Sequence, residues 1–107
     1  MGQENNVAVV TAGGGGIGRA IVLELSDRGY DVALMSRSEQ TASEVGGLGI
    51  RGSVTEANDL SKLVEATMKR FGRIDAVVCH TAHPPKGDLL AIDDEAWHQG
   101  LDMLILN

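Results

Sequence analysis

Four consecutive glycines, Gly13 to Gly16, stand directly after a short apolar run and directly before an amphipathic pattern. The preceding run, Val7–Val10, is continuous and β-branched, which is typical of a strand covered on both faces. From Ile17 to Leu25, apolar residues recur at helical spacing. A flexible linker seldom joins a buried strand to an amphipathic helix, so the glycines are interpreted as a tight strand-to-helix turn.

Strand and helix patterns alternate along the rest of the chain. We predict strands at 32–35, 48–54 and 74–79, helices at 38–45 and 56–71, and a last helix from about residue 93. Such alternation favours right-handed βαβ units. The predicted fold class is therefore α/β: a Rossmann-type doubly wound parallel sheet with helices on both faces and strand order 3-2-1-4.

Composition limits the partners and the location of the protein. A chain of 107 residues allows one domain or part of one. Its formal net charge of -6 would repel a phosphate backbone, so we expect no nucleic-acid partner. The lone Cys79 cannot form an internal disulfide, and no apolar run is long enough to span a bilayer. These observations favour a cytoplasmic protein with no membrane partner.

The turn from Gly13 to Gly18 meets the requirements of a pyrophosphate site. Such a site needs backbone N–H groups that point at the ligand, close approach without side chains, and the positive end of a helix. A Walker-type phosphate loop fits poorly, because Arg19 and Ala20 stand where Lys and then Ser or Thr are needed. The turn therefore predicts dinucleotide binding.

The run Val10-Thr11-Ala12-Gly13-Gly14-Gly15-Gly16-Ile17-Gly18-Arg19-Ala20 resembles the glycine signature of the short-chain dehydrogenase/reductase family, with Ala12 replacing the first glycine. Phe71 to Asp75 resembles the approach to the family's fourth strand, and His83 to Gly87 with Trp97 resembles a reductase-like branch. The resemblance implies cofactor contacts in the glycine turn, beside the adenine and beside the nicotinamide ribose. In that order, the implied contacts are Ala12, Gly14, Gly15, Gly16, Ile17 and Gly18; Ser53 and Val54; and Cys79, Thr81 and Ala82.

The chain also departs from the family's pattern. Cys79 to Ala82 replaces two asparagines, an alanine and a glycine, and Ser53 replaces an aspartate. In the register set by Trp97, the family's catalytic asparagine falls on Leu104. The family's serine, tyrosine and lysine are expected beyond the last residue, so we predict no catalytic residue within the chain. Residues 1–107 are interpreted as the N-terminal portion of a single NAD(P)-binding Rossmann domain, truncated or incompletely ordered at its C-terminal end.

The tip of the second predicted strand indicates which cofactor is preferred. An acid at this place holds the ribose hydroxyls of NAD, whereas a basic residue pairs with the 2′-phosphate of NADP. Here Ser36 and Arg37 offer a hydroxyl and a planar, permanently charged fork. We therefore predict NADP, with NAD less favoured. The alternative is that Arg37 is a solvated loop arginine.

These features favour an oxidoreductase that transfers hydride between NADPH and a small carbonyl or alcohol substrate, similar to 3-oxoacyl reductases. The alternative is a non-catalytic dinucleotide-binding or regulatory Rossmann protein. A methyltransferase of the same fold fits less well, because its usual acid is absent from the second-strand tip. The family resemblance further implies a homo-oligomer, either a dimer or a tetramer.

Three other patterns are interpreted as structural rather than as metal-binding or catalytic. Cys79, His80 and His83 are close in sequence, but adjacent strand residues point to opposite faces and no partner completes a tetrahedron, so no metal site is predicted. Cys79 is expected to be buried at the end of an apolar strand. Met68 and Met103 are expected in the core.

Overall fold

The computed structural model describes residues 5–37, 40–81 and 86–106, and it contains a four-stranded parallel sheet in the order β3-β2-β1-β4. The strands are β1 (Val7–Val10), β2 (Asp31–Ser36), β3 (Leu48–Arg51) and β4 (Ala76–Val78). The helices are α1 (Gly16–Asp27), α2 (Gln40–Val45), α3 (Ala57–Phe71), α4 (Asp94–Leu101) and the π-helical turn η1 (Asp102–Leu106). The predicted fold class and strand order are confirmed.

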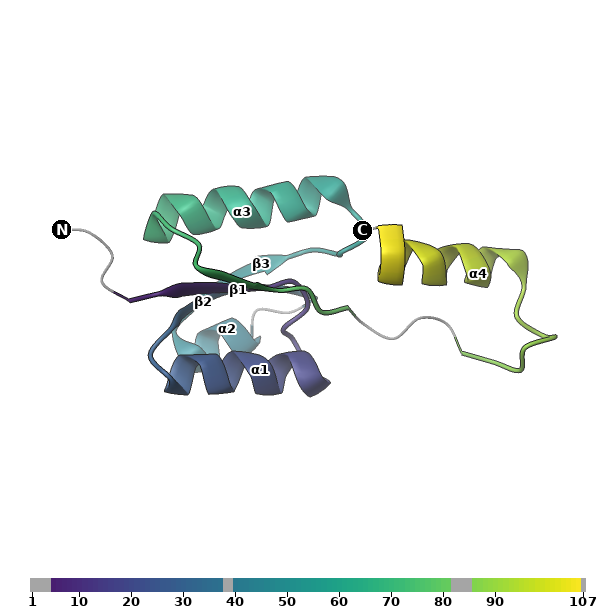
Figure 1. The fold of residues 1–107 in the computed structure, drawn as a ribbon, viewed down its shortest axis with the longest axis horizontal. Coiled ribbons are helices and arrows are strands. Elements are labelled where there is room, and N and C mark those ends of the chain that lie inside the picture. Colours follow the sequence, from purple (N-terminus) through teal and green to yellow (C-terminus); the bar gives the residue numbers. More distant parts are fainter. Residues whose placement is uncertain (1–4, 38–39, 82–85, 107) are drawn as a thin grey trace.

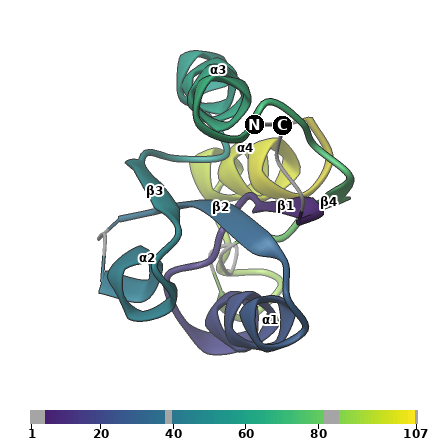
Figure 2. The ribbon, with the colours of Figure 1, turned by 90° about the vertical axis from the view of Figure 1, so that its left-hand side faces the viewer.

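Helices cover both faces of the sheet (Figure 1). The view along the long axis places α3 on one side, with α1 and α2 on the other (Figure 2). The side chains of β2 alternate between these layers: Ala33 and Met35 pack with Leu63 of α3, whereas Val32 and Leu34 pack with Val22 of α1. Continuous apolar strands therefore reflect burial on both faces.

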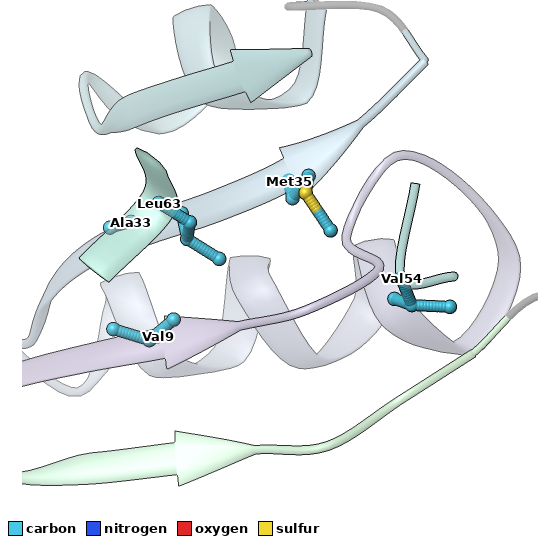
Figure 3. Packing of buried hydrophobic residues seen from close by; sticks show 5 residues of the cluster. All are labelled: Val9, Ala33, Met35, Val54 and Leu63. Atoms are coloured by element: carbon cyan, nitrogen blue, oxygen red, sulfur yellow. The ribbon is translucent and has the colours of Figure 1, made fainter. Parts of the chain in front are cut away.

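The cluster on the α3 side reaches past the ends of the strands (Figure 3). It consists of Val9, Ala33, Met35, Val54 and Leu63. Val54 lies beyond β3 and is only 7% exposed, so the segment after that strand is anchored to the core. This anchor fixes where the chain leaves the sheet.

Two strands are shorter than predicted. β3 ends at Arg51 rather than at residue 54, and β4 covers 76–78 rather than 74–79. The Gly52 N–H still donates to the Ser36 carbonyl at 3.2 Å, but the next N–H, that of Ser53, donates to the Asp59 carboxylate at 3.1 Å. Beyond Arg51 no residue of this segment is in register with β2, and the Asp59 side chain holds the Ser53 backbone.

Helix α3 buries a narrower stripe than its sequence predicts. Leu63 and Thr67 are buried, whereas Val64 and Met68 are 49% and 46% exposed. The Thr67 hydroxyl donates to the Leu63 carbonyl at 2.6 Å, which satisfies it inside the core. The expectation that Met68 belongs to the core is wrong, because the helix meets the sheet along one edge of its apolar face.

Helix α4 lies at the far end of the long axis of the molecule (Figure 1). Its start is capped, because the Asp93 carboxylate accepts from the Ala96 N–H at 2.8 Å. The helix continues directly into η1 and buries no residue completely. The radius of gyration is accordingly 15.0 Å, compared with about 13 Å for a compact domain of this length. Among the described helices, none combines the length and apolar character needed to cross a membrane.

Candidate functional site: a cavity at the carboxyl ends of the strands

The glycine turn packs too closely for a side chain at Gly14 and Gly18, and also at Gly13, where a Cβ would lie 2.9 Å from Val22 Cγ2. A Cβ on Gly18 would lie 1.9 Å from the Ala12 carbonyl oxygen, and a Cβ on Gly14 would lie 2.6 Å from the Cβ of Ser36. Gly18 therefore lets α1 begin directly against the end of β1, and Gly14 lets the turn reach the tip of β2. This is the physical reason that the turn requires glycine.

Hydrogen bonds fix the turn to its neighbours. The Gly13 N–H donates to the Met35 carbonyl of β2 at 3.0 Å, and the Thr41 hydroxyl of α2 donates to the Gly14 carbonyl at 3.2 Å. Gly15, the residue before α1, is extended, and no side chain caps the helix. The first turn of α1 also carries no acidic residue, so its partial positive charge is not offset locally.

The turn opens into a cavity of about 840 Å³ at the carboxyl ends of the strands. This volume lies in the range of small-molecule and cofactor sites. In an open parallel sheet, the carboxyl edge is where ligands bind. The cavity is lined by Thr11, Ala12, Gly14, Gly15, Gly16, Ile17, Met35, Ser36, Arg37, Arg51, Gly52, Ser53, Val54, Asp59, His80, Thr81 and Met103.

Most of the predicted contact residues meet at this cavity. Those that line it are Ala12, Gly14, Gly15, Gly16, Ile17, Ser36, Arg37, Ser53, Val54 and Thr81. Gly18 is buried behind the turn, and Cys79 is exposed without lining the cavity. Ala82 lies outside the described residues. The structure therefore brings together four segments that are distant in the sequence: the glycine turn, the end of β2, the residues after β3 and Thr81.

The tips of β1 and β4 are joined through one side chain. The Thr11 hydroxyl donates to the His80 carbonyl at 2.7 Å and accepts from the His80 N–H at 2.9 Å. His80 lines the cavity, and its ring would meet a Cβ on Gly18 at 2.9 Å. The sequence analysis assigned His80 only a structural role and missed this position, because the pattern of one strand does not reveal which face meets a turn.

Two further sulfur-containing residues differ from expectation. Cys79 is exposed rather than buried, since it follows the short strand β4 at the open edge of the sheet. Met103 is half-buried in η1 and lines the cavity, whereas the neighbouring Leu104 is 56% exposed. Met103 is therefore a wall of the cavity and not part of either core cluster.

The wall formed at the ends of β2 and β3 contains charged residues that sequence reasoning missed. Arg51, the last residue of β3, donates from Nε to the Arg37 carbonyl at 3.3 Å. Asp59 of α3 accepts from the Ser53 N–H. The signal for Arg51 was its place at a carboxyl strand end, but predicting the strand to continue to residue 54 concealed it.

The two groups with shifted pKa values, Arg73 and Asp75, lie at the amino ends of the strands, opposite the cavity. The Arg73 guanidinium hydrogen-bonds Asp75 and lowers the pKa of that carboxyl, and the Val7 N–H, which donates to the same carboxylate at 2.7 Å, lowers it further. Asp75 precedes β4 and Val7 begins β1, so the hydrogen bond between Val7 and Asp75 holds the amino ends of these two strands together.

In the part of the chain that the structure describes, no group of three His, Cys, Asp or Glu side chains is arranged to hold a metal ion.

Comparison with known proteins gives consistent results. Residues 6–106 match the family described as short chain dehydrogenase. Dehydrogenase/reductase SDR family member 4 from Caenorhabditis elegans is 36% identical over 105 residues, which cover 88% of this chain and 40% of that protein.

Solved structures share the fold. The 3-ketoacyl-(acyl-carrier-protein) reductase from Brucella melitensis, complexed with NADH, has a TM-score of 0.83 at 21% identity and matches 94% of this chain and 44% of its own. L-Sorbose reductase from Gluconobacter frateurii, complexed with NADPH and L-sorbose, has a TM-score of 0.82 at 23% identity and matches 99% of this chain and 44% of its own. The chain thus spans less than half the length of these proteins.

Proposed function

Because this chain belongs to the short-chain dehydrogenase family, we propose that its cavity binds NADP and that the protein transfers hydride between NADPH and a carbonyl or alcohol substrate. The observation that carries the proposal is the glycine turn: it approaches the tip of β2 too closely for any side chain and presents an uncapped helix start to the cavity. This geometry suits the pyrophosphate of a dinucleotide.

The residues around the cavity fit such a cofactor. Gly14, Gly15 and Gly16 would hold the pyrophosphate, and Ser53 and Val54 would lie beside the adenine. Thr81 would lie toward the nicotinamide, where the Thr11 bonds to His80 hold the tips of β1 and β4 in place. When bound, the cofactor supplies a transferable hydride. The chain's own residues would bind and orient it, while the acid and base groups of the reaction would come from outside these 107 residues.

The preference for NADP is supported by Arg37. This residue is exposed beside the cavity, directly after β2, and no carboxylate within the described ranges forms an ion pair with it. A guanidinium can bind a phosphate through two parallel hydrogen bonds. The related structures include complexes with NADH and with NADPH, so this preference depends on the residues of this chain.

A second candidate is a non-catalytic dinucleotide-binding or regulatory protein. It is favoured by the residues at the far end of the cavity, where His80, Thr81 and Met103 stand and Leu104 turns to solvent. Both candidates bind the dinucleotide, but only the first transfers hydride. We further expect the chain to form the N-terminal portion of one domain in a cytoplasmic homo-oligomer.

Titration of the full chain with NADPH and NADH, followed by nicotinamide fluorescence, tests the binding proposal. We expect tighter binding of NADPH, and an Arg37→Gln variant should lose that preference while it still binds NADH. Failure to bind either dinucleotide would eliminate both candidates. If NADPH binds, the consumption of NADPH with small ketones and keto-esters by the full-length protein, which would supply the acid and base groups, distinguishes an oxidoreductase from a binding protein.

A further inference from the structure

Two arginines from neighbouring strand tips lie on the same wall of the cavity. Arg51 is the register partner of Ser36, the last residue of β2, and Arg37 follows immediately. Both arginines line the cavity and both are exposed. Because the strands are parallel and adjacent, their carboxyl ends bring the two side chains to one edge of the sheet.

A hydrogen bond ties the second arginine to the backbone of the first. The Arg51 Nε donates to the Arg37 carbonyl at 3.3 Å, which uses one donor of the guanidinium. The two terminal nitrogens of Arg51 form no hydrogen bond or ion pair with the described residues. An arginine held in this way still offers a pair of N–H donors to an anion.

Within the described part of the chain, no carboxylate forms an ion pair with either arginine of this wall. Arg19, Arg28 and Arg73 each bond a carboxylate. Neither Arg37 nor Arg51 does so. Asp59, the carboxylate that also lines the cavity, instead accepts from the Ser53 N–H. Two adjacent cations repel each other, and an anion bound between them would relieve that repulsion.

We propose that Arg51 is a second phosphate-binding residue, which together with Arg37 forms a two-arginine site for a phosphomonoester on the adenosine ribose. The ligand class is an adenosine nucleotide with a 2′-phosphate. The inference rests on the proposed dinucleotide function and deepens it, because it makes cofactor preference depend on β3 as well as on β2. Arg51 then helps to select the 2′-phosphorylated cofactor and is more than a solvent-exposed arginine.

The test compares binding of four probes to the full chain: NADPH, NADH, adenosine 2′,5′-bisphosphate and adenosine 5′-monophosphate. In Arg51→Gln we expect affinity for the two 2′-phosphorylated probes to fall about tenfold, the usual scale for a hydrogen bond to a charged group. Affinity for NADH and adenosine 5′-monophosphate should stay unchanged. Arg51→Lys keeps the charge but not the paired donors, so its loss should be smaller.

Arg28→Gln is the matched control, since it removes one positive charge near the C-terminal end of α1, where Arg28 pairs with Glu24. It should leave all four affinities unchanged. An equal loss for phosphorylated and unphosphorylated probes in Arg51→Gln, or no loss at all, would overturn the role of Arg51 while leaving dinucleotide binding intact. If the unmodified chain binds NADH and not NADPH, the two-arginine site is wrong. If it binds neither, the proposed function fails with it.

Discussion

Among the described residues, the centre of the sheet is much more deeply buried than its β4 edge. In β1 every residue is buried, and the middle of β2 is at most 2% exposed. In β4, Val77 is 56% exposed, and α4 contains no buried residue. The cavity is shared between these regions: the glycine turn and Arg37 follow the buried strands β1 and β2, whereas His80, Thr81 and Met103 belong to the exposed end. Arg51 ends β3, an edge strand that is only partly buried. The dinucleotide contacts proposed for the glycine turn therefore rest on the most deeply buried part of the described sheet.

The largest expected difference is in stability. Leu34→Ala leaves a cavity in the fully buried layer between β2 and α1, and we expect it to lower the free energy of unfolding by about 3 kcal/mol. Val77→Ala removes apolar atoms from a side chain that is already mostly exposed, so its loss should stay below about 1 kcal/mol. Chemical denaturation of both variants measures the two values. Equal losses would contradict the contrast between centre and edge.

The next effect is expected at the glycine turn. In Gly18→Ala, the new Cβ would clash with the backbone at Ala12 and with the His80 ring, and we expect a loss of about 2 kcal/mol together with weaker NADPH binding. Gly15→Ala is the matched control, because its Cβ would meet no atom within 4 Å and its φ of -165° is extended. Thermal unfolding compares the two. A Gly18 variant as stable as the Gly15 variant would show that the turn is not tightly packed.

A smaller effect is expected at the amino ends of the strands. Hydrogen bonds from Arg73 and from the Val7 N–H lower the pKa of Asp75 below its ordinary value of 3.8. The charged carboxylate therefore contributes its full stability above that ordinary value, and the contribution disappears as the pH falls through the lowered folded pKa. Asp75→Asn should reduce stability at neutral pH and flatten its pH dependence under acidic conditions.

Arg73→Gln should flatten the same part of the pH profile by removing the first partner of Asp75. Unfolding curves collected from neutral pH down to pH 2 measure both variants. If both retain the full acid dependence of the original chain, the pair does not couple β4 to β1.

The smallest effect is expected at α4. Trp97 is 53% exposed, so Trp97→Phe should change the free energy of unfolding by less than about 0.5 kcal/mol. As the chain contains a single tryptophan, its emission also reports whether α4 is exposed to water. A loss above about 1 kcal/mol, or emission typical of a buried indole, would mean that α4 is covered in solution and that the contrast between the two regions is smaller.

Much of the fold followed from local patterns. The apolar strands β1 and β2, the glycine turn and the helical stripe of α3 each carry a periodic signal that their own residues determine. Strand ends were less predictable: the ladder of β3 ends at Arg51, and the next residues are held by the Asp59 carboxylate and by the burial of Val54. The exposure of Cys79 and Met68 depends on which elements stand beside them, and a single segment does not encode its neighbours.

The sequence alone determined the order of the elements, the family resemblance and the place of the glycine turn, because each depends on residues that are close along the chain. Only the tertiary structure brought Arg51 beside Arg37, joined Thr11 to His80, and made Met103 a wall of the cavity. The contacts of Arg51 with Arg37 and of Thr11 with His80 join residues that are 14 and 69 positions apart. They form because parallel strands place their carboxyl ends at one edge of the sheet. Met103 reaches the same cavity from η1, which lies past the end of the sheet. The glycine turn is thus encoded locally, whereas the specificity proposed for its cavity depends on the assembled sheet.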